Sequence, residues 1–344
     1  MHTVMKIVID DKIPFIRDSI NEIADEVRYI SGKDICAEDV KDADALIVRT
    51  RTICNRHLLE GSNVRFVATA TIGFDHIDTK YMSEAGIDWM NCPGCNAASV
   101  AQYVRSTIIL LNRYRGLNLK GSCLGIVGCG HVGTKVKEVA EELGMRVLIN
   151  DPPREERGDH EQFVTIDEIV ETCDVITFHV PIIKEGNHTT WHLCDSHLLE
   201  KMKKAPFIIN TSRGSVVDNT ALLKALDDRT IKDAIIDTWE NEPDICLPLL
   251  YKVYIGTPHI AGYSADGKAN ADNMVIEGLC RHYGLVNKYH IDPPTLPDTF
   301  RLPDDKNDAA LALYNPLEDS ERLKSHSERF EWLRGNYPLR REII

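Results

Sequence analysis

The segment LGIVGCGHVG, residues 124–133, constrains the fold more than any other part of the chain. Gly128, Gly130 and Gly133 form the pattern G-x-G-x-x-G between an apolar, strand-like run and a helix expected at residues 131–143. In such a turn the first glycine permits the sharp bend, the second lets the backbone approach a pyrophosphate, and the third lets helix and strand pack closely. The segment therefore predicts a dinucleotide-binding α/β unit, with phosphate at the helix N-terminus.

An acidic residue at the end of the next expected strand, residues 146–150, indicates which dinucleotide is bound. Asp151 is placed to accept hydrogen bonds from ribose hydroxyls and to repel a 2′-phosphate, which favours NAD over NADP. Two following cations, Arg154 and Arg157, leave NADP as an alternative. The expected cofactor site also includes the first helical residues, His131 and Val132.

Strand-like runs fall into two series that are separated by a long helix expected at residues 96–113. The first series consists of residues 5–10, 45–50 and 65–70, with a helix opening near Pro14. The second consists of residues 124–128, 146–150, 174–180, 206–211, 234–238 and 253–255. Because strands alternate with helices, we expect an α/β fold of two Rossmann-like, doubly wound parallel-sheet domains with an active-site cleft between them.

Composition excludes several classes of function. The formal net charge of −13 over 344 residues opposes binding to nucleic acid or to an anionic membrane. No apolar run approaches the roughly 20 residues of a membrane-spanning helix, and no secretion signal is visible. Ten cysteines scattered along a long chain are typical of reduced thiols. We therefore expect a cytoplasmic protein.

Two short patterns carry less weight. Cys92 and Cys95 form C-x-x-C, which we interpret as a packed turn rather than a redox motif because no thioredoxin-like setting surrounds it. His188 and His192 have a spacing that would allow zinc binding on a helix. The residues between them favour extended structure, so we expect no metal site.

Three polar residues follow expected strands of the second series, where open α/β sheets bind ligands. His259 is suited to act as acid and base near neutral pH. Glu242 would orient its imidazole and stabilise the imidazolium. Arg213 offers a planar fork for a carboxylate. Together these residues suit the oxidation of a hydroxy acid, although a histidine in a strand-end loop can also be purely structural.

The glycine segment and the stretches INTSRGSVVDNTAL, DTWENEP and GTPHIAGYS, in that order, resemble the D-2-hydroxyacid dehydrogenase family. The resemblance implies that Arg213, Glu242 and His259 are catalytic and that NAD accepts the hydride. Stretches such as ATATIGFDHID, PGCNAASVAQYV and NDPPREERGD resemble one branch of that family, over about residues 5–285. That branch oxidises a phosphorylated four-carbon 2-hydroxy acid during pyridoxal 5′-phosphate synthesis.

The resemblance to this branch also assigns ligand contacts. It implies substrate contacts at Thr50, Thr71, Arg213 and Tyr263. It implies cofactor contacts at Asp151, Val180, Asp237 and Gly262. We further predict that Arg49, rather than Arg51, binds the substrate phosphate, because an acidic protein needs local positive charge for an anion.

The expected domain organisation follows the same resemblance. Residues 1–96 and 258–288 would bind substrate, and residues 97–257 would form the NAD-binding domain. Residues 289–344 would form a linker and a short C-terminal module, in which FEWLRGNYPLRRE resembles part of a dimerisation domain, so a homodimer is expected. Two alternatives remain: a relative acting on 3-phosphoglycerate or glycerate, and a non-catalytic NAD-sensing scaffold.

Overall fold

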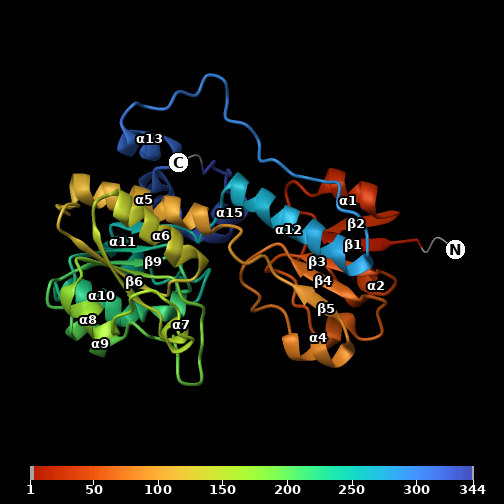
Figure 1. The fold of residues 1–344 in the computed structure, drawn as a ribbon, viewed down its shortest axis with the longest axis horizontal. Helices are drawn as coiled ribbons and strands as arrows, with labels where there is room; N and C mark the ends of the chain where they lie inside the picture. The colour runs from red at the N-terminus through yellow and green to blue at the C-terminus, as the bar shows by residue number, and fades with distance from the viewer. Residues whose placement is uncertain (1–3, 343–344) are drawn as a thin grey trace. The chain divides into compact units, whose positions relative to one another are not determined.

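The computed structural model describes residues 4–342 and divides into two compact units (Figure 1). The first consists of Met1–Asn96 and Ser264–Asp298. The second consists of Ala97–Tyr263 and Thr299–Ile344. Each unit has its own parallel sheet and its own hydrophobic core.

The first unit contains a sheet of five parallel strands: β1 (Lys6–Asp10), β2 (Glu26–Ile30), β3 (Ala45–Val48), β4 (Phe66–Thr69) and β5 (Asp88–Met90). Their order across the sheet is β2-β1-β3-β4-β5. The apolar pattern of the sequence does not predict the two edge strands. β2 and β5 are only partly buried and lack the continuous apolar runs of β3 and β4.

The helices of the first unit are α1 (Arg17–Ile23), α2 (Ala37–Val40), α3 (Arg56–Leu59), α4 (Thr79–Ala85) and α12 (Ala265–Tyr283). Figure 1 shows α12 beside the sheet, although it begins at Ala265 and the first segment of the unit ends at Asn96. The helix buries Val275, Ile276 and Leu279 in the same core as Ile9 and Ile47. Gly278 allows the close approach, since a Cβ there would stand 2.0 Å from the sulfur of Met90.

The second unit contains the six expected strands: β6 (Cys123–Val127), β7 (Arg146–Asn150), β8 (Val175–Phe178), β9 (Phe207–Asn210), β10 (Asp233–Ile236) and β11 (Ile255–Gly256). All pair in parallel, in the order β11-β10-β9-β8-β6-β7. The expectation of doubly wound parallel sheets is confirmed. The chain order reverses beside β6, and the crevice at such a point is where open α/β sheets bind ligands.

Helices cover this second sheet. They are α5 (Ala97–Tyr114), α6 (His131–Glu142), α7 (Pro152–Glu156), α8 (Ile166–Thr172), α9 (Ser196–Glu200), α10 (Asn219–Asp227) and α11 (Leu247–Lys252), with a 3-10 turn at Gly214–Val216. Fourteen residues of α5 are buried, so this helix is a core element of the unit. Within residues 4–342, no helix is both long and apolar enough to cross a membrane.

The C-terminal tail packs into the second unit. It forms α13 (Lys306–Leu313), α14 (Pro316–Ser325), a 3-10 turn at Ser327–Arg329 and α15 (Phe330–Gly335). Leu323 and Phe330 are fully buried in a cluster with Trp239, Leu249 and Val253. The tail therefore completes the core of this unit and brings its side chains to the loops after β10 and β11.

Candidate active site

The glycine turn after β6 has a shape that only glycine permits at two of its three positions. Gly128 has φ +89°, and a Cβ there would stand 2.6 Å from Cγ1 of Val180. A Cβ on Gly133 would stand 2.2 Å from the carbonyl oxygen of Gly128. At Gly130 the Cβ would meet nothing within 4 Å, so open space adjoins the N-terminus of α6. The turn thus fits a pyrophosphate held by backbone N–H groups.

Asp151 stands at the end of β7 and is bonded to this turn. Its Oδ2 accepts a hydrogen bond of 2.8 Å from the backbone N–H of Cys129, and its Oδ1 accepts one of 3.1 Å from that of Arg154. The Arg154 guanidinium donates to the Cys129 carbonyl and, through Nε, to Asp159 at 2.9 Å. The carboxylate therefore lies beside the glycine turn, where the ribose of a dinucleotide is expected.

His259 and Glu242, which follow β11 and β10 respectively, form a hydrogen-bonded pair. The His259 Nδ1 lies 2.8 Å from Oε2 and 3.1 Å from Oε1 of Glu242. The backbone N–H of Trp239 donates to Oε1 of Glu242 at 2.9 Å. His259 has φ +58°, a backbone conformation that is unusual for residues other than glycine and that is enriched at functional sites.

The charge of Glu242 depends on its neighbours. The side chain is only 14% exposed, and burial by itself raises the pKa of Glu242. The charge and hydrogen bond of His259, together with the Arg334 guanidinium, outweigh burial and lower the pKa below its ordinary value. Glu242 is therefore a carboxylate at neutral pH, able to orient a neutral imidazole and to stabilise an imidazolium.

Asp237 holds the loop that carries His259. Its carboxylate accepts hydrogen bonds from the Thr257 hydroxyl at 2.7 Å and from the backbone N–H groups of Ile260 at 2.7 Å and Ala261 at 2.9 Å. Burial raises the pKa of Asp237, and the His259 charge and these hydrogen bonds oppose the increase. The resemblance predicts that Asp237 contacts the cofactor, and the contacts that the structure shows for its carboxylate brace this loop.

Arg213 stands after β9, in a turn that packs against the segment carrying Glu242. A Cβ on Gly214 would lie 1.8 Å from the carbonyl oxygen of Trp239, so only glycine allows the two backbones to approach. The Arg213 guanidinium donates to the Ser212 carbonyl at 2.9 Å, and Asn210 donates to the Arg213 carbonyl at 2.9 Å. Tertiary packing thus places the Arg213 turn beside the Trp239–Glu242 segment.

Two tail residues that are absent from the predicted site lie here. Arg334 Nη1 stands 3.3 Å from Oε2 of Glu242. Arg340 is buried and donates to the carbonyls of Ile260, Ala261 and Tyr263, in the loop that includes Gly262. Both arginines lie in the stretch FEWLRGNYPLRRE, whose resemblance to part of a dimerisation domain does not indicate a place at the active site.

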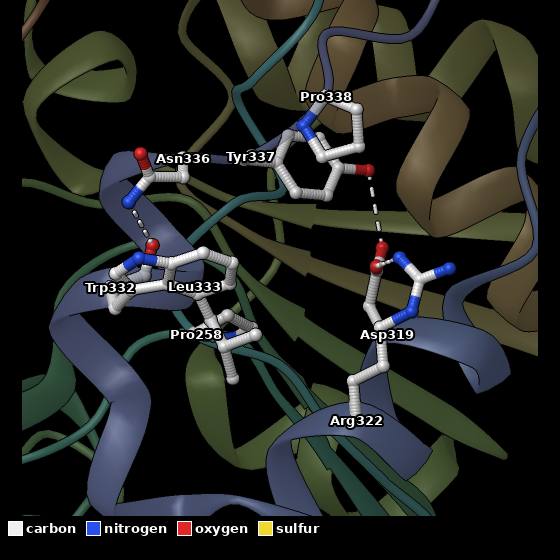
Figure 2. Close-up of a pocket in the computed structure, with 8 residues that line it drawn as sticks. All are labelled: Pro258, Asp319, Arg322, Trp332, Leu333, Asn336, Tyr337 and Pro338. Carbon is white, nitrogen blue, oxygen red and sulfur yellow. Dashed lines mark hydrogen bonds and ion pairs between the residues drawn. The ribbon is translucent and has the colours of Figure 1, made fainter.

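A pocket of about 260 Å³ adjoins Pro258, the residue before His259 (Figure 2). The tail forms most of its wall, with Trp332, Leu333 and Tyr337 from α15 and the segment after it. Figure 2 shows the Tyr337 hydroxyl donating to Asp319, over 3.1 Å. The tail is therefore fixed next to the loop that carries His259.

The expected substrate residues of the first unit lie at the ends of β3 and β4. The Arg49 guanidinium forms two hydrogen bonds, of 3.1 and 3.2 Å, with the carboxylate of Asp10, which is fully buried. Thr50 is exposed. The Thr71 hydroxyl lies 2.7 Å from that of Thr69 and donates to the Gly73 carbonyl at 2.9 Å. Arg49 keeps 21% exposure, so a phosphate would have to share it with Asp10.

The histidine pair His188/His192 and the C-x-x-C motif at Cys92 and Cys95 make ordinary structural contacts. His192 Nε2 lies 2.7 Å from Glu240, and its Nδ1 lies 3.7 Å from Asp218. No group of three or more possible metal ligands occurs among residues 4–342. Cys92 and Cys95 are both buried free thiols, and the Cys92 thiol donates to the carbonyls of Thr69 and Ala271.

Comparison with known proteins decides the family. Residues 96–261 match the family model "D-isomer specific 2-hydroxyacid dehydrogenase, NAD binding domain". The chain is 55% identical over 338 residues to the erythronate-4-phosphate dehydrogenase of Bacteroides thetaiotaomicron. The aligned residues make up 98% of this chain and 97% of the relative. The chain belongs to the D-isomer specific 2-hydroxyacid dehydrogenases. Within this family it lies in the erythronate-4-phosphate dehydrogenase branch, as the sequence motifs predicted.

More distant members of the family support the same assignment. The erythronate-4-phosphate dehydrogenase of Porphyromonas gingivalis is 41% identical, over 98% of this chain and 94% of the relative. Among solved structures, a 3-phosphoglycerate dehydrogenase of Entamoeba histolytica with bound NAD⁺ has TM-score 0.68 and 27% identity, and covers 83% of this chain and 100% of its own. The expected enzyme class and the NAD-binding domain are thereby confirmed, and the family match includes the glycine turn, Glu242 and His259.

Proposed function

We propose that this protein oxidises 4-phospho-D-erythronate to 2-oxo-3-hydroxy-4-phosphobutanoate with NAD⁺, as a step of pyridoxal 5′-phosphate biosynthesis. The proposal takes its substrate from the branch, since the named relatives match over nearly the whole chain. The observation that carries the chemistry is the 2.8 Å contact between His259 Nδ1 and Glu242. An imidazole held through Nδ1 presents Nε2 to a substrate hydroxyl.

When bound, NAD⁺ would supply the acceptor for the hydride on C2 of the substrate. His259 Nε2 takes the proton of the C2 hydroxyl, so that one hydride and one proton leave and the C2 alcohol becomes a ketone. Glu242 stabilises the imidazolium that forms, because its carboxylate is held against Nδ1. Arg213 binds the substrate carboxylate through its planar guanidinium.

The remaining site residues receive roles from the resemblance and from their positions. Tyr263, Thr50 and Thr71 contact the substrate, and Arg49 binds its phosphate. The cofactor is held by the glycine turn and the residues around it, namely Gly128, Gly130, His131, Val132, Gly133, Asp151, Val180, Asp237 and Gly262. The open space at Gly130 and the Asp151 carboxylate beside the turn support this assignment, and the carboxylate favours NAD over NADP.

The proposal also assigns a role to each segment of the chain. Residues 1–96 and 258–288 bind substrate, residues 97–257 bind NAD, and residues 289–344 supply a linker and a surface for homodimerisation. A cytoplasmic location is proposed with it, supported by the ten scattered cysteines, all of them free thiols.

An assay of NADH formation with 4-phospho-D-erythronate, 3-phosphoglycerate and D-lactate, side by side, tests the function. We expect kcat/KM for phosphoerythronate to exceed the other two by at least about 100-fold, because each lacks groups that the site binds. A preference for 3-phosphoglycerate would place the protein in another branch. NAD binding without turnover of any of the three would indicate the non-catalytic scaffold instead.

A further inference from the structure

Arg334, in the tail, reaches the carboxylate that orients His259. Its Nη1 lies 3.3 Å from Oε2 of Glu242, and Oε2 is the oxygen that lies 2.8 Å from His259 Nδ1. The three side chains are partly or largely buried, with 18%, 14% and 28% exposure for Arg334, Glu242 and His259. Imidazole and guanidinium therefore share one carboxylate oxygen in a poorly solvated place, where charges interact strongly.

The arginine is held in place by the surrounding tail. Phe330, on the same helix, is fully buried in the core of the second unit. Beyond the helix, Tyr337 meets Tyr263 edge to face, with ring centroids 6.2 Å apart, and Arg340 is bonded to the backbone of the loop after His259. Arg334 is thus anchored from both sides, as a residue that orients another must be.

We propose that Arg334 is a positioning residue of this dehydrogenase. Its guanidinium shares the Glu242 carboxylate with His259 and so weakens the attraction between that carboxylate and the imidazole. This inference rests on the proposed function, because the proposed function assigns His259 as the base. It also makes the C-terminal tail part of the active site.

Electrostatics supports this geometry. Burial opposes the charge on Arg334, yet Tyr263 and Glu242 raise its pKa overall, so the guanidinium remains charged. Among residues 4–342, the groups whose charges act on the pair or on Arg334 include Asp237 and Tyr263, and the Arg213 turn packs beside the same segment. Arg334 is a cation and shares Oε2 with the imidazole, whereas the Trp239 N–H donates to Oε1. Removal of Arg334 therefore strengthens the attraction of the carboxylate for the imidazole and favours the protonated imidazole.

The test compares pH profiles of kcat/KM for the wild type, Arg334→Met, Arg334→Gln and Arg334→Lys. Oxidation needs a neutral base, so activity falls at low pH. We expect this acid limb to move up by about half a pH unit or more in the two neutral variants, and to stay near the wild-type position in Arg334→Lys. We also expect kcat to fall by about tenfold in Arg334→Met and to recover in part in Arg334→Lys.

Arg329→Met is the matched control. Arg329 is an exposed arginine on the adjoining turn, and it stacks on Trp332, 4.0 Å from the ring centroid. Its variant should keep the wild-type profile. An acid limb that stays in place or moves down in both neutral Arg334 variants would overturn the proposal, even if kcat falls, because general damage to tail packing predicts that result. Arg334→Gln serves if Arg334→Met does not fold.

A second readout separates this inference from the proposed function. The His259 imidazole is titrated by NMR in the NAD⁺ complex of each variant, with its signals identified as those missing from His259→Gln. An upward shift of the midpoint in Arg334→Gln supports the charge sharing without any turnover, and an unchanged midpoint contradicts it. A wild-type protein that is inactive on phosphoerythronate would refute the proposed function and leave this titration valid.

Discussion

His259 and Glu242 meet through a 2.8 Å contact between imidazole Nδ1 and carboxylate Oε2, although they stand after different strands of the second sheet. Parallel strands bring their carboxyl ends to one edge, so residues distant in the chain converge there. The same edge carries the Arg213 turn, packed against the Trp239–Glu242 segment through Gly214.

The first prediction concerns the proposed base. His259→Gln should lower kcat for phosphoerythronate by about 1000-fold or more, because the amide of glutamine cannot take up the hydroxyl proton. The dissociation constant for NAD⁺, measured by calorimetry, should change by less than about threefold, since His259 acts on the substrate. A variant with wild-type kcat would remove His259 from the mechanism.

The second prediction uses two glycines of one turn. Gly130→Ala should fold normally but bind NAD⁺ about tenfold more weakly, because its Cβ points into open space that the pyrophosphate needs. Gly133→Ala should lower the free energy of unfolding by about 3 kcal/mol, because its Cβ would stand 2.2 Å from a backbone oxygen. Thermal unfolding and NAD⁺ titration measure both effects. Unchanged NAD⁺ affinity in stable Gly130→Ala would contradict the proposed cofactor position.

The third prediction concerns Arg49 and has two parts. Arg49→Ala should raise KM for phosphoerythronate by about tenfold or more and leave KM for unphosphorylated erythronate within about twofold, since only the former carries the phosphate. The variant should also lose about 2 kcal/mol of stability, because the buried Asp10 carboxylate loses its guanidinium partner and retains the hydrogen bond from the Lys12 N–H.

Arg28→Ala provides the comparison for Arg49, because Arg28 pairs with Asp42 at a more exposed place in the same unit. Its effect on stability should be no more than about 0.5 kcal/mol, with no effect on KM. Equal changes of KM for both substrates in Arg49→Ala would reject the phosphate assignment and leave Arg49 as a structural ion pair.

The fourth prediction is a pH dependence of stability. Burial raises the pKa of Asp272 from its usual 3.8 to about 7, although its Oδ2 accepts a hydrogen bond from the Phe15 backbone N–H at 3.1 Å. Between about pH 4 and 7 the unfolded chain releases this proton and the folded chain retains it, so the free energy of unfolding falls as pH rises. Above about pH 7 both states are ionised, and this contribution no longer changes.

Asp272→Asn isolates that effect, since an amide does not titrate. The stability of the variant relative to wild type should increase from pH 4 to 7 by on the order of 3 kcal/mol and then remain constant. Urea unfolding at intervals of one pH unit measures it. A constant difference across this range would show that the Asp272 carboxyl ionises at the same pH in both states.

Local sequence determined the parts of this protein that depend on neighbouring residues. Continuous apolar runs identified the central strands, and the spacing of Gly128, Gly130 and Gly133 identified the dinucleotide turn. Family motifs pointed to Arg213, Glu242 and His259. The edge strands β2 and β5 were missed because partial burial leaves no continuous apolar run to recognise.

Tertiary structure alone decided the contacts between distant residues. Arg334 is 92 residues from Glu242 in the chain, and Arg49 is 39 residues from Asp10. Charged residues occur throughout the sequence, and no periodicity marks which of them will meet. Their pairing follows from how buried side chains such as Phe330 fill the core, because that packing sets where the tail lies and which carboxylate its arginines reach.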